Sequence, residues 1–264
     1  MTKKSIQKNL RNCLPAGKLV ALLLATAALQ NTNAQSTPQE IMNRIYAKYD
    51  STTYLTFDVK YVYSTDTVNG RFKTDVIKGT YTMAGKKALY NIGDIQFMQN
   101  DSFFISMYPK DKFIIVANPR TRNTGSELPM RSVIDSMMLS YSQHYTVKIS
   151  SDSTEGAIKF IRADSMVQFD KFIINYDIED YYLNSIKYEF QEPEIVNEND
   201  TTGSQPQTTL RKKSLTIKFS NYRVDNFSDK NYNENNYIWF EDGECKPVDK
   251  YKGFRVFYSR SGIY

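Results

Sequence analysis

Few residues of this 264-residue chain have a type and spacing suited to catalysis. The single histidine, His144, has Ser140 and Ser142 beside it, and an imidazole activates a serine only within hydrogen-bond reach. Because serines are frequent in this segment, we interpret His144 as a helix C-terminal residue that complements the helix dipole. The alternative hypothesis is a hydrolase, which predicts turnover that is lost in His144→Ala.

The other reactive side chains also lack a catalytic arrangement. No cluster of Cys, His and carboxylates has zinc spacing, and no G-x-S-x-G, P-loop or dinucleotide motif occurs. Glu179-Asp180 and Glu241-Asp242 are adjacent in sequence, which is typical of turns rather than of an acid/base pair. Cys245 lies in a turn-like setting, and we interpret it as a passive thiol. We therefore predict a protein that is not an enzyme and has no cofactor or metal.

Two stripes of large apolar side chains point to a different function. Both have the spacing i, i+1, i+4, i+5, i+8, which at 100° per residue gathers five side chains into an arc of roughly 140°. We predict two short amphipathic helices in a chain that otherwise has the pattern of β-strands. The stripes comprise Ile41, Met42, Ile45, Tyr46 and Tyr49, and then Val133, Ile134, Met137, Met138 and Tyr141.

Each stripe follows a sequence typical of a helix N-terminus. Thr37 and Glu40 have the spacing of a capping box, and Pro38 stands at the first helical position, where its missing N–H costs nothing. Ser132 and Asp135 have the same spacing before the second stripe. We expect the first helix to end within residues 50–53.

Residues 1–34 have the features of an export signal. Five basic residues precede the apolar segment from Leu19 to Leu29, which is too short to span a bilayer. Ala34 supplies a small residue at the expected cleavage position. We predict a cleaved signal peptide, Gln35 as the mature N-terminus, and a soluble protein of the periplasm. An uncleaved N-terminal anchor is the alternative.

The net charge argues against nucleic-acid binding, and the number of cysteines argues against a disulfide-stabilised fold. The whole chain has a net charge of +5, but without the signal segment 29 basic and 29 acidic residues remain. We find no basic stretch longer than Arg211-Lys212-Lys213, and aromatic residues alternate with acidic as often as with basic ones. These features do not favour nucleic-acid binding. The mature chain keeps one cysteine, so it can form no intrachain disulfide.

The remaining residues, from Tyr54 onward, have the pattern of short strands. Twenty tyrosines and 15 phenylalanines favour β-sheet, and apolar and polar residues alternate with a period of two. Turn residues such as Asn69-Gly70 separate successive strands, which is typical of an antiparallel meander. We predict the final strands over residues 237–240 and 254–259.

Residues 191–209 interrupt this pattern. They are polar, acidic at the start, and lack a large apolar face. We predict a long, mobile hairpin loop between paired strands over residues 182–190 and 215–222. A domain boundary is the alternative, but we favour a single domain over residues 35–264.

The order of these elements resembles the family of periplasmic lipoprotein carriers LolA and LolB, over about residues 36–260. Local similarities include Leu55-Thr56-Phe57-Asp58, the Gly-Thr-aromatic strand from Lys78 to Met83, and Asn100-Asp101 with the aromatic strand that follows. Members of the family usually continue the Gly-Thr strand with Arg-Pro, and that arginine helps to latch the helical lid. This chain has Gly85-Lys86-Lys87 instead, and a lysine cannot form the same bidentate fork.

We predict a mainly β fold: a curved antiparallel sheet, or incomplete β-barrel, of about ten or eleven strands with the two helices covering its concave face. The predicted function is a carrier that binds the acyl chains of lipoproteins or lipids. Exposure of one long acyl chain to water costs on the order of 12 kcal/mol. Burial of five lid residues, at roughly 1.5–3 kcal/mol each, provides a free energy of the same order. Met130, Met137 and Met138 favour an adaptable apolar surface. The expected cavity and lid residues are Ile41, Ile45, Tyr49, Phe57, Met83, Ile134, Met137, Met138 and Tyr141.

Two alternatives remain open. The helices can simply seal one sheet face as ordinary core. The scaffold can also serve an envelope interaction or stress-sensing protein without a transport role, which would use residues 191–209 and the aromatic C-terminal strands. The resemblance further implies an inner-membrane donor complex and an outer-membrane acceptor as partners, and we expect a monomer.

Overall fold

The computed structural model describes residues 36–66, 72–118, 131–139, 142–167, 169–196, 207–224 and 228–259. The elements below belong to one compact unit from Thr37 to Tyr264. The predicted signal segment, the Asn69-Gly70 turn and Tyr141 lie outside the described residues.

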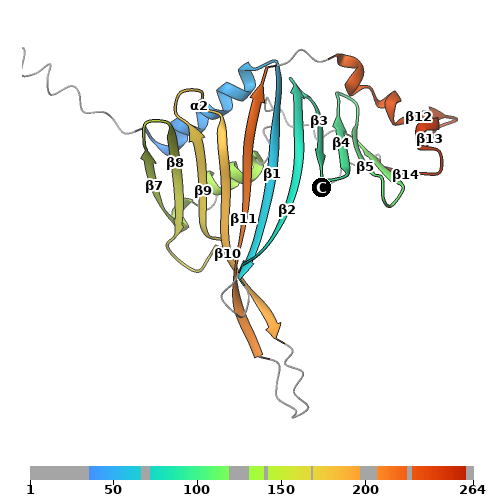
Figure 1. The fold of residues 1–264 in the computed structure, drawn as a ribbon. Helices are drawn as coiled ribbons and strands as arrows, with labels where there is room; N and C mark the ends of the chain where they lie inside the picture. Colours follow the sequence, from blue (N-terminus) through green and yellow to red (C-terminus); the bar gives the residue numbers. More distant parts are fainter. Residues whose placement is uncertain are drawn as a thin grey trace, which may run out of the picture. The chain divides into compact units, whose positions relative to one another are not determined.

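Most of the described strands form one large sheet (Figure 1). Its strands are β1 (Tyr54–Asp66), β2 (Phe72–Ala84), β3 (Lys87–Ile92), β4 (Ile95–Gln99), β5 (Phe104–Tyr108), β6 (Phe113–Ala117), β7 (Tyr145–Ser151), β8 (Glu155–Arg162), β9 (Phe169–Asp177), β10 (Leu183–Val196), β11 (Gln207–Arg223) and β14 (Arg255–Ser259). They follow the order β14-β6-β5-β4-β3-β2-β1-β11-β10-β9-β8-β7. The order is linear, so these 12 strands are not closed into a barrel, as predicted.

Two details of the predicted sheet are wrong. The sheet is mixed rather than antiparallel, because β14 pairs with β6 in parallel. It has 12 strands instead of ten or eleven, and β12 (Ile238–Glu241) and β13 (Glu244–Pro247) form a second, two-stranded sheet. A parallel pair needs a long connection, so no turn motif in the sequence can indicate that β14 adjoins β6.

Two helices accompany the sheet, α2 (Pro38–Ser51) and α3 (Arg131–Leu139). The predicted capping box is confirmed at α2: the Glu40 N–H donates to Thr37 Oγ1 at 3.2 Å, and the Thr37 N–H donates to Glu40 Oε2 at 2.7 Å. The cap predicted at Ser132 is wrong, because α3 already begins at Arg131. No helix of the described residues has the length and apolar character needed to cross a membrane.

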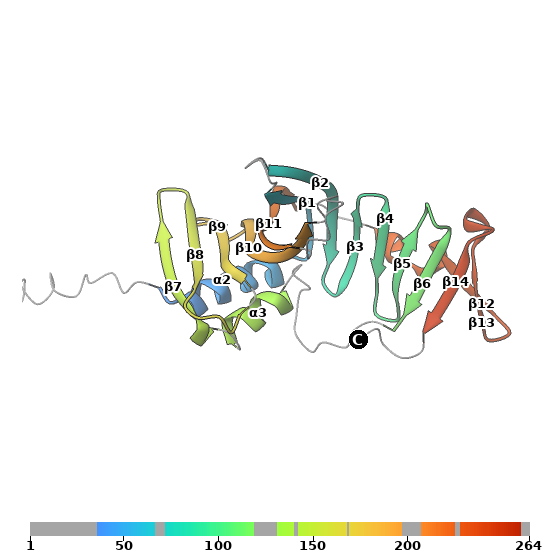
Figure 2. The ribbon, with the colours of Figure 1, turned by 90° about the horizontal axis from the view of Figure 1, so that it is seen from below.

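The principal core lies between the helices and one face of the sheet. It unites the whole first stripe, on α2, with Ile134 of α3 and with buried residues of β1, β2 and β7 to β11. Figure 2 shows both helices on the same side of strands β8 to β11. We call this side of the sheet the helix-bearing face. It carries residues such as Phe57, Val59 and Ile217, whose side chains alternate with those of the opposite face.

A second core lies at the β14 end of the sheet. We call residues 228–259 the C-terminal segment. Its residues Tyr237, Ile238 and Tyr251 pack against buried residues of β4 to β6, which are Met98, Ile105, Met107 and Ile114. The C-terminal segment therefore covers β4 to β6, while α2 and α3 belong to the other core.

The structure contradicts the predicted loop over residues 191–209 at both of its ends. β10 and β11 continue to pair as far as Val196 and Gln207, beyond the last pairs that they form with β9 and β1. A two-stranded ribbon thus extends from the sheet (Figure 1). Lys213 pairs with Glu192 across it at 2.6 Å. The sequence of this ribbon lacks the regular alternation of large apolar and polar residues that marks an ordinary strand.

Candidate functional site

The structure gathers six of the nine predicted cavity and lid residues into one buried cluster. They are Ile41, Ile45 and Tyr49 of α2, Phe57 and Met83 of the sheet, and Ile134 of α3, each at most 3% exposed. Met138 is half-buried and packs against the cluster. The side chain of Met137 and all of Tyr141 lie outside the described residues. The helices therefore close directly over the sheet in this structure.

A closed set of hydrogen bonds anchors α2 to the sheet. The Leu183 N–H donates to the Tyr49 hydroxyl at 3.3 Å, and the Tyr222 hydroxyl donates to the Leu183 carbonyl at 2.7 Å. The two tyrosine oxygens lie 2.7 Å apart, so Tyr49 donates to Tyr222. Burial raises the pKa of Tyr49 and of Tyr222, so both hydroxyls keep their protons. Each polar group in this buried set has a partner.

The outer side of α2 contacts the turn between β9 and β10. Arg44 Nη1 donates to the Tyr181 hydroxyl at 2.7 Å. Lys48 Nζ lies 3.4 Å from Asp180 Oδ1 and 4.7 Å from the centroid of the Tyr182 ring. Exposed pairs of this kind contribute at most about 1 kcal/mol each, yet they fix α2 in place together with the buried set.

Polar contacts join α3 to α2. The Tyr46 hydroxyl donates to Asp135 Oδ1 at 2.6 Å, and the Arg131 guanidinium lies 4.3 Å from the centroid of the Tyr46 ring. Arg131 also lies 3.7 Å from Asp50 and 3.8 Å from Asp135. Burial, followed by the hydrogen bond to Asp135, raises the pKa of Tyr46. We call Tyr46, Asp50, Arg131 and Asp135 the helix junction.

The sequence analysis missed the helix junction. Arg131 precedes the second stripe, and nothing in its spacing indicates that it meets Tyr46, 85 positions earlier. Of the two lysines at the place where the carrier family usually has Arg-Pro, Lys87 has another partner: its Nζ lies 3.1 Å from Asp229 of the 3-10 helix η2 (Asp229–Tyr232). Lys87 therefore binds the C-terminal segment rather than a helix of the lid.

Within the helix junction, the Arg131 guanidinium does not have a full set of hydrogen-bond partners among the described residues. Nε and Nη1 of Arg131 are buried without a hydrogen-bond partner among the described residues. The ion pairs to Asp50 and Asp135 exceed hydrogen-bond length, so they do not fully replace the lost hydration of the guanidinium. The contact between α2 and α3 is weaker than the buried anchor of Tyr49.

Apolar side chains continue along the helix-bearing face beyond the buried cluster. Tyr61 and Ile77 lie opposite each other on β1 and β2, and Ile77 is 48% exposed. In the next row Tyr63 lies opposite Leu215, which in turn lies opposite Tyr188. Tyr63 and Leu215 are only half-buried. We call Tyr61, Tyr63, Ile77 and Leu215 the apolar extension.

One polar atom in this region has no partner. The Tyr188 side chain is 3% exposed, and its hydroxyl makes no hydrogen bond within the described part of the chain. Burial raises its pKa, so the hydroxyl remains a neutral donor. An unpartnered buried hydroxyl costs about 1–3 kcal/mol, which a ligand acceptor would recover.

His144 and Cys245 have settings that the sequence did not fully predict. His144 ends the 3-10 helix η1 (Ser142–His144), and its Nδ1 lies 2.8 Å from Asp164 Oδ2, a partner that we missed. The hydrogen bond from His144 lowers the pKa of Asp164. Cys245 lies in β13 opposite Phe240 rather than in a turn. Burial raises the pKa of its thiol to about 11, which makes it a poor nucleophile near neutral pH.

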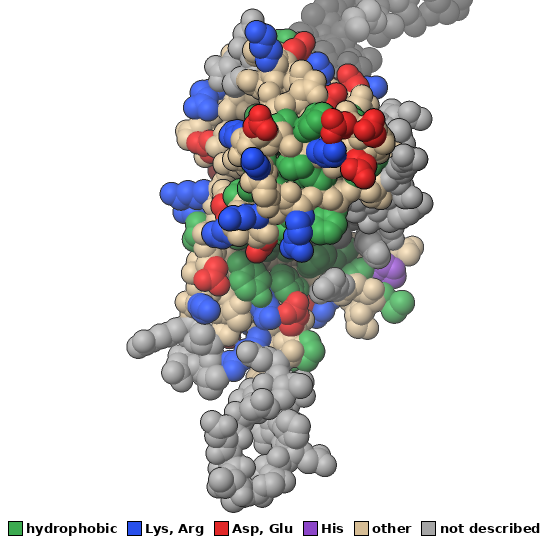
Figure 3. All heavy atoms as spheres, turned by 90° about the vertical axis from the view of Figure 1, so that its right-hand side faces the viewer, with side chains coloured by type: hydrophobic (Ala, Val, Ile, Leu, Met, Phe, Trp, Pro, Cys, Tyr) green, Lys and Arg blue, Asp and Glu red, His purple; other side chains and the backbone are tan. Residues whose placement is uncertain are grey.

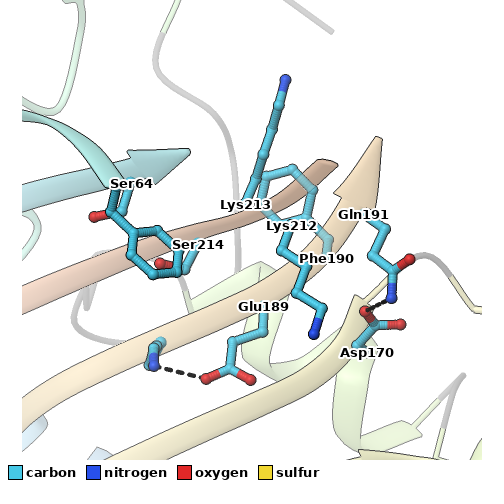
Figure 4. Close-up of a pocket in the computed structure, with 10 residues that line it drawn as sticks. Ser64, Asp170, Glu189, Phe190, Gln191, Lys212, Lys213 and Ser214 are labelled. Carbon is cyan, nitrogen blue, oxygen red and sulfur yellow. Dashed lines mark hydrogen bonds and ion pairs between the residues drawn. The ribbon is translucent and has the colours of Figure 1, made fainter. Parts of the chain in front are cut away.

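A hollow of about 520 Å³ lies at the base of the ribbon (Figure 4). Most of its charged groups have partners: Lys187 Nζ lies 2.6 Å from Glu189 Oε1, Lys213 Nζ lies 2.6 Å from Glu192 Oε2, and Gln191 Nε2 donates to Asp170 at 3.0 Å. In Figure 4, Lys212 and Lys213 point in opposite directions, as expected of neighbours in a strand. Among the described residues, Lys212 is the one charged group of this lining without an ion-pair partner.

Aromatic side chains are exposed at the β14 end of the sheet. Trp239, Phe240 and Phe257 are 41%, 43% and 52% exposed. Phe240 stacks on Phe103 at 5.7 Å between ring centroids and contacts Tyr258 edge-on at 5.5 Å. Figure 3, which faces this side, shows apolar side chains among basic and acidic ones.

No model of a known protein family and no curated protein matches this sequence. Solved structures show a likeness at low identity. A LolA superfamily protein from Nitrosomonas europaea is 11% identical, with 76% of this chain and 100% of that chain covered and a TM-score of 0.35. A putative outer membrane lipoprotein-sorting protein domain from Vibrio parahaemolyticus is 11% identical, with 74% and 96% covered and a TM-score of 0.32.

The MucA/MucB complex of Pseudomonas aeruginosa also contains a similar chain, at 12% identity and a TM-score of 0.30. Here 79% of this chain covers 62% of that chain. The resemblance to LolA superfamily and lipoprotein-sorting proteins that the sequence indicated is therefore found among solved structures. It concerns the fold alone, and the function below is argued from the residues of this chain.

Proposed function

We propose that the protein is a non-enzymatic carrier that binds the acyl chains of lipids or lipoproteins on the helix-bearing face, and that α3 is the element that moves aside. The observation that carries this proposal is the apolar extension, which continues the buried core past the helices and leaves Ile77 48% exposed. A half-exposed apolar surface that adjoins a movable cover suits a long, flexible apolar ligand.

In this proposal the state with α3 packed on the sheet and the state with an acyl chain in its place have comparable free energies. Each methylene of an acyl chain gains about 0.8 kcal/mol on burial, and Ile134 with Met138 offers roughly 3–6 kcal/mol of competing burial. A chain of several methylenes can therefore replace α3 on the sheet. The uncompensated guanidinium of Arg131 lowers the free energy needed to separate α3 from α2.

The Tyr188 hydroxyl gives the ligand a polar contact. An ester, amide or carboxyl oxygen at the head of an acyl chain would accept the hydrogen bond that this buried hydroxyl does not make within the described residues. In this proposal the carrier works in the periplasm and receives its cargo from an inner-membrane donor complex for an outer-membrane acceptor.

Displacement of a fluorescent fatty acid, with native mass spectrometry of the complex, tests the proposal. Ile77→Asp should weaken binding at least about tenfold, because it places a charge in the apolar extension. Val76→Asp is the matched control, since Val76 is 47% exposed on the opposite face of the same strand. Equal loss in both variants, or no fatty-acid binding by the native protein, would refute the carrier function.

A second function, an envelope interaction or stress-sensing protein, is favoured by the ribbon and by the exposed aromatic side chains around Trp239. A variant in which an Asn-Gly turn replaces residues 194–209, so that Pro193 still pairs with Leu210, separates the two functions. A carrier should keep its affinity for fatty acids in this variant. An interaction protein should lose its partner in pull-downs while the fold, measured by circular dichroism, persists.

A further inference from the structure

Three lysines stand side by side across the middle of the sheet. Lys60 of β1 lies directly opposite Lys78 of β2 on one side and opposite Lys218 of β11 on the other. All three are exposed, and they alternate with buried residues such as Val59 and Ile217. The row therefore lies on the face opposite the helices.

This row is electrostatically unfavourable in the isolated protein. Directly opposite residues of an antiparallel pair have Cβ atoms about 4.5–5.5 Å apart, and like charges at that spacing destabilise the sheet. None of the three ammonium groups has a carboxylate within 4.0 Å among the described residues. The net charge of the mature chain gives no reason for such a cluster, since its acidic and basic residues are equal in number.

The lysine row borders a hollow of about 390 Å³. Gly79 also lines it, and because a Cβ at this position would overlap the carbonyl oxygen of Asn91, β2 and β3 can approach this closely only with glycine here. The Thr80 N–H donates to Asn91 Oδ1 at 2.6 Å, so the amide nitrogen of Asn91 remains available as a donor. The lining residues are Asp58, Val59, Lys60, Lys78, Gly79, Thr80, Asn91 and Ser220.

The one carboxylate among the described residues that line the hollow, that of Asp58, already has hydrogen-bond donors. Asp58 accepts hydrogen bonds from Thr80 Oγ1 at 3.2 Å and from Asn221 Nδ2 at 2.7 Å. The hollow at the base of the ribbon differs, because all of its charged lining groups except Lys212 have an ion-pair partner among the described residues. The hollow beside the lysine row therefore carries an excess of positive charge together with hydroxyl and amide donors.

We propose that this hollow and the lysine row form a binding site for a phosphate-type anion, either a free phosphate or the phosphate group of a lipid headgroup. Lysine binds phosphate as a point charge, and Lys60 and Lys78, which line the hollow, can share the charge of a single group with Lys218 beside them. The site lies on the face opposite the proposed acyl site and does not depend on that site. An anion there would also relieve the repulsion within the row.

Binding is tested with two probes, inorganic phosphate by NMR titration and phosphatidylglycerol vesicles by co-sedimentation, with phosphatidylcholine vesicles as reference. The triple variant K60Q/K78Q/K218Q should weaken binding at least about tenfold. The matched control K86Q/K230Q/K252Q removes the same charge from exposed lysines outside the row and should change binding less than about twofold. Binding should also weaken in high salt.

Each outcome decides the proposal. Phosphate binding that the row variant loses identifies a soluble ligand, and binding of phosphatidylglycerol vesicles alone identifies a headgroup; both support the site. The proposal is overturned when neither probe binds, or when the control variant loses as much affinity as the row variant.

A single substitution separates binding from a structural role. Lys60→Gln should raise the Tm of the phosphate-free protein by about 1–2 °C, because it removes repulsion from the middle of the row. The same variant should lose most of the Tm increase that phosphate produces. A lysine that only stabilises the sheet would lower the Tm when replaced, and that result would contradict the proposal.

Discussion

The helices α2 and α3 carry the same apolar stripe and yet are attached to the molecule in different ways. All five stripe residues of α2 are buried, its N-terminus is capped, and Tyr49 joins a closed set of buried hydrogen bonds. In α3, Ile134 is buried and Met138 half-buried, and the polar contacts run mainly through Arg131 and its neighbours. Equal hydrophobic patterns therefore do not imply equal roles.

The difference lies in the partners of the polar groups. The hydroxyl of Tyr49 bonds to the sheet itself, whereas the hydroxyl of Tyr46 bonds to α3. Of the two helices of the expected lid, α2 is thus bonded to the sheet, and we call α2 and the sheet together the framework. The helix α3 is bonded to α2. In the proposed function α2 stays with the sheet while α3 opens.

The largest expected effect comes from removing one buried isoleucine from each helix. Ile45→Ala should lower the free energy of unfolding by about 2–5 kcal/mol, because it leaves a cavity in the framework. Ile134→Ala should lower it by no more than about 2 kcal/mol, because the loss cannot exceed the free energy that holds α3 closed. Urea denaturation followed by circular dichroism measures both values. Equal losses would remove the distinction between the helices.

A smaller effect is expected from two matched tyrosine variants. Tyr46→Phe removes the hydrogen bond to Asp135 but keeps the ring beside Arg131, whereas Tyr181→Phe removes a hydrogen bond from Arg44 of α2. Each bond contributes about 1 kcal/mol. Stopped-flow binding of a fluorescent fatty acid should accelerate about fivefold in Tyr46→Phe, because the weakened junction opens more often, and remain unchanged in Tyr181→Phe. Acceleration in Tyr181→Phe alone would identify α2 as the moving helix.

The smallest effect concerns the capped end of α2. Hydrogen bonds from Thr37 lower the pKa of Glu40 from its ordinary value of 4.5, so the carboxylate stabilises the folded state above that pH. This contribution is lost as the pH falls through the lowered pKa. The Tm of the native protein should therefore decrease more between about pH 5 and pH 3 than that of Glu40→Gln, which can still form the cap but does not titrate. Identical pH profiles would show that the negative charge of Glu40 does not stabilise the fold.

Local patterns sufficed to predict the elements that have one buried face. The capping box and the stripe from Ile41 to Tyr49 predict α2, and alternation predicts the strand over residues 169–177, which is β9. The strands of the ribbon and β13 lack a regular alternation of apolar and polar residues, so alternation could not reveal them. The parallel pair of β14 and β6 joins residues 142 positions apart, such as Phe113 and Arg255, beyond the reach of any turn motif.

The candidate sites, too, could be predicted only where their residues follow a local sequence pattern. The stripes identified six residues that the structure buries together, and their part in ligand binding stays a prediction. The helix junction was missed because Tyr46 and Arg131 meet only through the packing of the two helices. The lysine row was missed because Lys60, Lys78 and Lys218 become neighbours through strand register, which a scan for basic stretches cannot detect.

Hydrogen exchange of the backbone amides, with and without a long-chain fatty acid, tests the central claim most directly. We predict that amides of α3 exchange faster than those of α2 in the ligand-free protein, and that fatty acid changes exchange in α3 and protects β1 and β11 around the apolar extension while α2 stays the same. Equal protection of the two helices, with no response to fatty acid in α3, would contradict the account.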